Sequence, residues 1–241
     1  MYTPTTSGTI ESVTQAGFGS NYQYRRRKFL KFFSKTTQFL AGPIISFTFR
    51  LFFRVEILGQ ENLKMISSPL IIISNHISFF DSFIFRLVLK GYTSFLPLRF
   101  MAVKKFNSKY LNFLAKIGLI EIIYAIFGVF TIKRGLGISK NLEEANKILA
   151  DKGNLVIYPE GEIFQSANNI GIFRIGAAVL AQKTGASVLP VAMKITKKSH
   201  FRRKFTVNIG KRIVINKDIS VPSHSITTNF HDEILELYKQ I

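Results

Sequence analysis

The amino-acid sequence predicts an α/β fold in which a mostly parallel sheet is flanked by helices. Short, isoleucine-rich apolar stretches such as residues 70–74 are typical of strands that are buried on both faces. Segments with helical character alternate with these strands along the chain. The 241 residues, of which 47% are hydrophobic, are enough for one sizeable domain. We expect this single α/β domain to span residues 55–241.

The N-terminal part of the chain predicts a different organisation. Residues 1–24 are polar and rich in Ser and Thr, which predicts a disordered tail. Four polar residues then recur at spacings of three and four on one helical face, while phenylalanines occupy the rest of the helix. These four residues are Lys28, Lys31, Lys35 and Gln38.

The dipeptide Gly42-Pro43 predicts a helix break, followed by a second, mostly apolar helix that ends near residue 54. We interpret residues 25–54 as an amphipathic and apolar helix pair that lies in a membrane interface. The alternative is a helix pair that packs on the core and keeps its lysines in water.

Within the domain, strands and helices are predicted in alternation. The predicted strands are residues 70–74, 101–103, 129–132, 155–158, 187–194 and 205–215. The predicted helices are residues 81–90, 110–127, 141–150 and 175–184.

Composition narrows the class of partner. The chain has 33 Lys and Arg against 14 Asp and Glu, and the net charge of +19 indicates an anionic partner, either nucleic acid or an anionic membrane. The 24 phenylalanines favour the membrane, so no nucleic-acid partner is expected. No stretch of the sequence is apolar enough to span a bilayer. We therefore expect peripheral or monotopic association with anionic lipids on the cytoplasmic face, and the oligomeric state stays open.

Polar residues follow three of the predicted strands directly. The carboxyl ends of neighbouring parallel strands meet at one edge of a sheet, where ligands bind. This convergence predicts a functional site. Its members are Asn75 and His76 after the first strand, Lys133 and Arg134 after the third, and Glu160 and Gly161 after the fourth.

His76 and Asp81 are the candidate reactive pair. An aspartate five residues beyond the histidine can orient the imidazole ring and favour its protonation during turnover, as a general base requires. Two structural alternatives compete with this interpretation. Asp81 lies three residues after Ser78, which resembles a helix capping box, and His76 can be a buried histidine with satisfied hydrogen bonds. Lys133-Arg134 alone is typical of a solvated surface pair.

The grouping resembles a known family. Residues 75–81, NHISFFD, fit the Asn-His-x-x-x-x-Asp signature of the glycerolipid (lysophospholipid) acyltransferases. Four further stretches are similar to blocks of that family and occur in the family's order, over about residues 55–215. These stretches are GVFTIKRG (128–135), YPEG (158–161), FRIGA (173–177) and LPVA (189–192).

The resemblance implies an activity and residue roles. In that family a histidine, here His76, removes a proton from a lysophospholipid hydroxyl, which attacks the thioester of acyl-CoA or acyl carrier protein. Asp81 would orient the base and Arg134 would hold the acceptor phosphate. The other expected substrate contacts are Asn75, Ser78, Lys133, Glu160, Gly161 and Arg174. No cofactor is implied. The four histidines show no zinc-ligand pattern, and the absence of cysteine excludes a thiolate site.

One departure from the family pattern concerns the acceptor. Glu162 and Ile163 stand where the family usually has Thr-Arg. The predicted acceptor is 1-acylglycerol 3-phosphate, which gives phosphatidic acid. The alternatives are another lysolipid or alcohol, or a non-catalytic module that binds anionic lipid or nucleic acid, for which the basic cluster at 197–204 argues.

Overall fold

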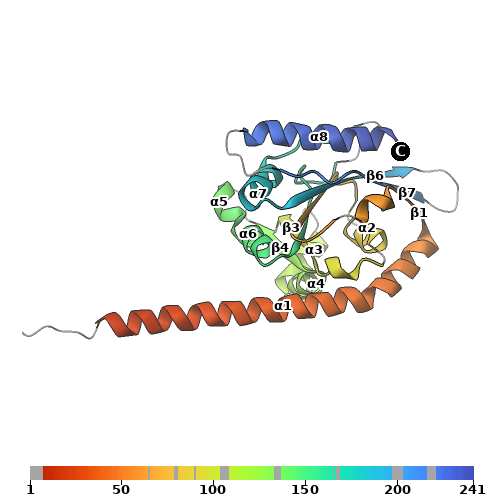
Figure 1. Ribbon diagram of the computed structural model, residues 1–241. Coiled ribbons are helices and arrows are strands. Elements are labelled where there is room, and N and C mark those ends of the chain that lie inside the picture. The colour runs from red at the N-terminus through yellow and green to blue at the C-terminus, as the bar shows by residue number, and fades with distance from the viewer. Residues whose placement is uncertain are drawn as a thin grey trace, which may run out of the picture.

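A seven-stranded sheet forms the centre of the protein (Figure 1). The computed structural model describes residues 8–64, 66–78, 81–89, 91–103, 109–132, 137–164, 166, 169–196, 203–215 and 221–241. The strands are β1 Phe53–Leu58, β2 Leu70–Ser74, β3 Leu98–Val103, β4 Val129–Ile132, β5 Asn154–Ile157, β6 Ser187–Thr196 and β7 Arg203–Ile209. Their order is β1-β7-β6-β2-β5-β3-β4, and only the β6–β7 pair is antiparallel. The predicted, mostly parallel α/β sheet is confirmed.

Helices cover both faces of the sheet (Figure 1). They are α1 Gly8–Phe52, α2 Asp81–Val88, α3 Lys109–Lys116, α4 Leu119–Phe127, α5 Ile138–Asn141, α6 Glu143–Ala150, α7 Gly176–Thr184 and α8 Ser223–Lys239, with short 3₁₀ turns at Gln60–Leu63 and Thr93–Phe95. Two apolar cores result. Ile72 of β2 packs in the core that includes α2, while Ile71 and Ile73 pack in the core that includes α6, α7 and α8. A strand buried on both faces explains the continuous apolar run.

Several predicted boundaries differ from the structure. The helix predicted at 110–127 is two helices, α3 and α4, separated at Gly118, whose φ of 78° ends the first one. The helix predicted at 141–150 is preceded by the short α5. The edge strand β1 and the C-terminal helix α8 were not predicted, and residues 44–54 were assigned to a helix that in fact ends at Phe52.

The N-terminal segment departs most from the prediction. The predicted break at Gly42-Pro43 is wrong, because α1 runs from Gly8 to Phe52 with Pro43 inside it. It bends toward the sheet at its C-terminal end (Figure 1). Pro43 lacks the N–H that would bond to the Phe39 carbonyl, and one residue earlier Arg86 Nε donates a hydrogen bond to the Gln38 carbonyl at 3.1 Å. A side chain at Gly42 would collide with the Arg86 guanidinium, so glycine is needed there for this contact.

The disordered tail predicted for residues 1–24 is wrong from residue 8 onward, because these residues extend α1, and residues 1–7 lie outside the described residues. Extending an existing helix does not repeat the cost of nucleation.

One face of α1 docks on the domain through polar groups. Gln38 is buried, and its Nε2 donates to the carbonyls of Leu98 at 2.8 Å and Phe127 at 3.0 Å. Its Oε1 accepts the Leu98 N–H at 2.9 Å. Lys31, on the same face, donates to the carbonyl of Asp151 at 3.1 Å. The polar face of this helix is thus directed at the domain, whereas the core-packing alternative kept its lysines in water. We call this attachment the α1 dock.

The opposite face of α1 is apolar and exposed. Phe32 and Phe47 are 70% and 68% exposed, and Phe29, Phe39, Leu40, Ile44, Leu51 and Phe52 are also exposed. Within the described part of the chain, no helix combines the length and the apolar character that crossing a bilayer requires.

Candidate active site

His76 and Asp81 form a hydrogen-bonded pair at the carboxyl end of β2. His76 lies two residues beyond this strand, and Asp81 begins α2. The distance from His76 Nδ1 to Asp81 Oδ2 is 2.9 Å. The Asp81 side chain is fully buried, whereas that of His76 is 21% exposed. Because Nδ1 is engaged with Asp81, the other ring nitrogen, Nε2, is the one that can accept a proton from a substrate.

Asp81 also holds the loop that carries the histidine. Its Oδ2 accepts the backbone N–H groups of Ile77 at 2.8 Å and Ser78 at 2.9 Å. The bond to Ser78 is the reciprocal half of a capping box. The capping alternative and the catalytic interpretation are therefore both compatible with one geometry, since a single oxygen makes all three contacts. The described residues offer no hydrogen-bond donor to the other oxygen, Oδ1, which is also buried.

Asn75 braces the same loop from the other side. Its Nδ2 donates to the Met193 carbonyl at 2.8 Å and its Oδ1 accepts the Met193 N–H at 2.8 Å. Asn75 is only 1% exposed, and Met193 belongs to β6, the neighbour of β2. In this geometry the Asn75 side chain links the loop after β2 to the backbone of β6, and the substrate contact expected for it stays a prediction.

Glu160 connects the loop after β5 to the histidine loop. Its Oε2 accepts the His76 N–H at 2.8 Å and its Oε1 accepts the Gly171 N–H at 2.7 Å. Burial raises the pKa of this carboxyl, although the two N–H bonds and the nearby His76 oppose the shift. Both oxygens are occupied by backbone groups. Glu160 therefore shapes the site by holding its loops together.

Gly161 and Arg174 lie side by side next to Glu160. Gly161 has a φ of 73°, and a Cβ there would come within 2.7 Å of Arg174 Nε. Arg174 is exposed, and its Nε donates to the Glu160 carbonyl at 3.3 Å. The described residues contain no ion pair between Glu162 and Arg174, and Glu162 is exposed beside them. Arg174 is thus an exposed cation on the loop that Glu160 ties to His76.

The second predicted stretch is only partly described. Strand β4 ends at Ile132, at the same edge of the sheet as the carboxyl end of β2. Lys133 and Arg134 follow directly but lie outside the described residues. Their assignment as substrate contacts stays a prediction.

Tyr158 is a site residue that the prediction did not include. It follows β5 directly, and its ring stacks on the His76 ring with the centroids 4.2 Å apart and an interplanar angle of 15°. The signal was present in the sequence, because Tyr158 opens the YPEG stretch and follows a strand at the same sheet edge as His76.

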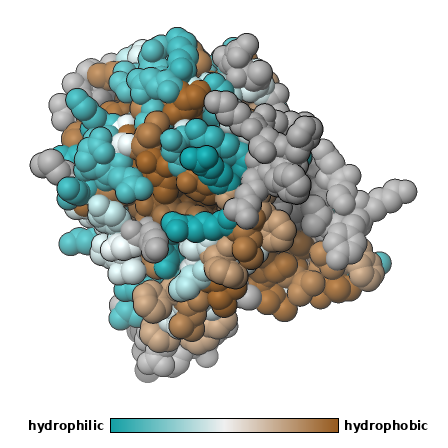
Figure 2. All heavy atoms as spheres, turned by 90° about the vertical axis from the view of Figure 1, so that its right-hand side faces the viewer, coloured by the Kyte–Doolittle hydropathy of each residue, from teal (hydrophilic) through white to brown (hydrophobic). Residues whose placement is uncertain are grey.

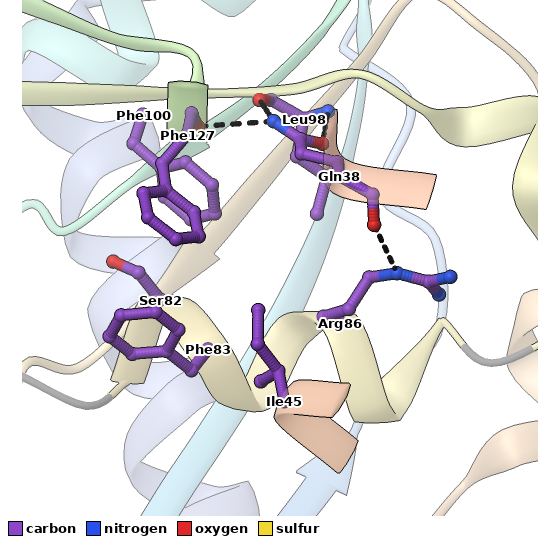
Figure 3. Close-up of a pocket in the computed structure, with 8 residues that line it drawn as sticks. All are labelled: Gln38, Ile45, Ser82, Phe83, Arg86, Leu98, Phe100 and Phe127. Carbon is purple, nitrogen blue, oxygen red and sulfur yellow. Dashed lines mark hydrogen bonds between the residues drawn. The ribbon is translucent and has the colours of Figure 1, made fainter. Parts of the chain in front are cut away.

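An apolar pocket adjoins Asp81 (Figure 3). It lies between α1, α2, α4 and β3 and is lined by Gln38, Ile45, Ser82, Phe83, Arg86, Leu98, Phe100 and Phe127. Ser82 follows Asp81 directly, and its Oγ lies 3.5 Å from the Tyr158 hydroxyl. The pocket therefore begins one residue away from the histidine–aspartate pair.

The fold and the site together define an α/β protein with a histidine–aspartate pair at the carboxyl edge of its sheet. A sequence model of the Acyltransferase family matches residues 54–194, which is more than half of the chain. The chain belongs to the acyltransferase family. The matched region contains His76, Asp81, Tyr158, Glu160 and Arg174.

Sequence relatives agree with this assignment. A chloroplastic 1-acyl-sn-glycerol-3-phosphate acyltransferase of Arabidopsis thaliana is 29% identical over 171 residues, which cover 68% of this chain and 42% of the relative. The enzyme of that name from Borreliella burgdorferi is 28% identical over 173 residues, or 71% of this chain and 60% of the relative. The chain thus spans about half the length of these curated relatives.

The crystal structure of the 1-acyl-sn-glycerophosphate (LPA) acyltransferase PlsC from Thermotoga maritima has the same fold. Its TM-score is 0.59 at 19% identity, with 93% of this chain and 89% of that chain covered.

Proposed function

We propose that this acyltransferase moves a fatty acyl chain from a thioester, either acyl-CoA or acyl carrier protein, to the hydroxyl of a lysophospholipid. The observation that carries the proposal is the His76 Nδ1–Asp81 Oδ2 pair, 2.9 Å apart, at the carboxyl edge of the sheet.

The chemistry follows from the geometry. His76 Nε2 accepts the proton of the acceptor hydroxyl while the oxygen attacks the thioester carbonyl. A C–O bond forms, the C–S bond breaks, and the proton on His76 passes to the leaving thiolate. The buried charge of Asp81 stabilises the imidazolium that forms in between, because the low dielectric of the site strengthens their attraction. No metal and no cofactor takes part in this scheme.

The acceptor that we favour is 1-acylglycerol 3-phosphate, which would give phosphatidic acid. The names of the relatives from Arabidopsis thaliana and Borreliella burgdorferi, both 1-acyl-sn-glycerol-3-phosphate acyltransferases, support this choice. Arg134, and the exposed Arg174 beside Gly161, are the cations that would bind its phosphate. The exposed Glu162 and Ile163 favour a second candidate, a lysolipid or alcohol without a free phosphate, because an acid near that position repels phosphate.

The membrane would be the source of the acceptor. Helices α3 and α4, which lie beside α1 in Figure 1, also carry exposed apolar side chains, namely Phe113, Leu119 and Ile122. Figure 2 shows apolar atoms gathered along the lower part of the molecule, where Figure 1 places α1 and α4. The net charge of +19 would add attraction to anionic headgroups. We propose peripheral association through this surface, with the cytoplasmic face as the expected side.

The test measures transfer from labelled acyl-CoA, and separately from acyl carrier protein, to lysophosphatidic acid in mixed micelles. Wild-type protein should form phosphatidic acid, and His76→Ala should lower the rate by about 10²–10⁴ without loss of fold. The exposed His224→Ala is the matched control and should retain full activity. Product with other lysolipids or alcohols but not with lysophosphatidic acid would select the second candidate. Equal rates for wild type and His76→Ala would contradict catalysis by His76.

A further inference from the structure

The His76 ring is held at one atom by Asp81 and across one face by Tyr158. The imidazole ring turns about its Cβ–Cγ bond, and the hydrogen bond at Nδ1, which lies off that axis, limits large turns but still allows small ones, because hydrogen-bond angles are soft. A second, flat group packed against the face removes this freedom. Tyr158 is such a group, since its ring lies within 15° of parallel to the imidazole at 4.2 Å between centroids.

Tyr158 is itself anchored from behind. Its ring packs against Phe85 of α2, with the centroids 6.4 Å apart, and Phe85 is fully buried in the core. The Tyr158 hydroxyl approaches Ser82 Oγ, also on α2, at 3.5 Å. Strand β5 fixes the backbone, because Ile157 pairs with Ile73 of β2. The tyrosine ring is therefore a rigid surface rather than a mobile side chain.

We propose that Tyr158 is a positioning residue whose ring sets the plane of the His76 imidazole and so aims Nε2 at the acceptor hydroxyl. This inference rests on the proposed function for its catalytic consequence. The ring, and not the hydroxyl, performs the task. Burial raises the pKa of the Tyr158 hydroxyl well above its ordinary value of 10.0, and the charge of Asp81 raises it further, so the hydroxyl stays protonated and takes no part in proton transfer.

Alignment of this kind has a large effect on rate. A general base works only when its nitrogen, the proton and the acceptor oxygen are close to linear, and a displacement of about 1 Å can cost about 100-fold. Substrate binding does not need this alignment. A ring that is free to swing should therefore lower kcat and leave KM nearly unchanged.

Three variants separate the ring from the hydroxyl and from general core damage. Tyr158→Phe keeps the ring and removes the hydroxyl, so its kcat should stay within about twofold of wild type. Tyr158→Leu removes the flat ring at similar volume, so its kcat should fall about 10- to 100-fold with KM within about threefold. Phe205→Leu removes another buried aromatic of the same core, whose ring contacts are with Phe49 and Phe53, and should leave kcat unchanged.

An activity-independent measurement reports the stacking directly. In histidine-labelled protein, the ring C–H signals of His76, assigned from the spectrum of His76→Gln, should be shifted upfield by the tyrosine ring. Tyr158→Phe should keep this shift, and Tyr158→Leu should lose it and broaden the signals.

Three results would overturn the inference: an unchanged His76 spectrum in Tyr158→Leu, a kcat for that variant within twofold of wild type, or equal damage in Tyr158→Phe. Wild-type protein that forms no product with any acceptor would overturn the proposed function instead. In that case the His76 spectra would still test whether Tyr158 orients the imidazole ring.

Discussion

Two buried polar clusters of this protein use the same kind of contact for different ends. In the α1 dock, the neutral amide of Gln38 makes hydrogen bonds to the backbone of Leu98 and Phe127 through both of its polar atoms. At the carboxyl edge of the sheet, where His76 lies, the carboxylates of Asp81 and Glu160 also accept backbone N–H groups. The dock attaches a helix, whereas the edge holds a loop and leaves one ring nitrogen of His76 for a substrate.

The comparison of a neutral amide with a carboxylate shows what a buried charge costs and what it can contribute to a site. A neutral amide with satisfied hydrogen bonds can be buried at modest cost, whereas a carboxylate requires several donors to offset its desolvation. Asp81 has three donors on one oxygen. Burying such a charge is useful where a positive charge develops nearby, and the proposed mechanism places one on His76 during proton transfer. The variants below test two expectations. The negative charge of Asp81 should affect kcat, whereas the hydrogen bonds of Gln38 in the α1 dock should affect only stability.

The largest effect is expected for Asp81→Asn. The asparagine can keep the size and one acceptor oxygen, but it removes the charge that stabilises the His76 imidazolium. We expect kcat to fall by about 10²–10⁴ while circular dichroism and the unfolding midpoint change little. Steady-state kinetics with the proposed donor and acceptor provide the measurement. A kcat within threefold of wild type would mean that the charge is not needed, and the contrast between the two clusters would disappear.

Gln38→Leu tests the dock. Leucine fills the space but leaves the Leu98 N–H and two carbonyls without partners, so the free energy of unfolding should fall by about 2–4 kcal/mol in urea titrations. The kcat of the folded fraction should stay within about twofold of wild type, because no reacting group is touched. Thr36→Ala, at an exposed position of the same helix, should change stability by less than about 0.5 kcal/mol. Equal stability for Gln38→Leu and Thr36→Ala would contradict the claim that Gln38 stabilises the attachment of α1.

Glu160→Gln should combine both kinds of effect. A glutamine oxygen can accept one of the two N–H groups, and the amide nitrogen cannot accept the other. One buried N–H is left unpaired, which should cost about 1–3 kcal/mol of unfolding free energy and lower kcat, because the His76 backbone loosens. Glu162→Gln is the same chemical change at an exposed neighbour and should leave stability unchanged. If the two variants are equally stable, Glu160 does not hold the loops.

The smallest effect is expected on the outer face of α1. Phe47→Ser removes an exposed ring, so it should weaken co-sedimentation with phosphatidylglycerol vesicles by about tenfold, which corresponds to the lower end, about 1.5 kcal/mol, of what a buried Phe contributes. The unfolding free energy should not change. The exposed Asn112→Ala should bind vesicles like wild type. Unaltered binding of Phe47→Ser would argue against the apolar α1 surface as the membrane contact.

Some unpredicted elements did carry local signals. In β1, Phe53, Val55 and Ile57 pack inward and alternate with exposed residues, which is the pattern of a strand with one buried face. In α8, Ile226, Phe230 and Ile234 recur every four residues and are buried. The continuity of α1 through Pro43 is different, because α1 packs on the domain there through contacts such as Arg86 Nε to the Gln38 carbonyl, which no local pattern reveals.

The sequence by itself determined the alternating strands and helices, the position of His76 just beyond β2, and the Asp81 contact, because that contact spans five residues and one turn. Local periodicity and capping chemistry act over such distances. Only the tertiary structure decided the partners that come from far along the chain. Glu160 reaches His76 across 84 residues, and Asn75 reaches Met193 across 118. These pairs exist because β2 lies between β5 and β6 in the sheet, and strand order is set by packing of the whole core.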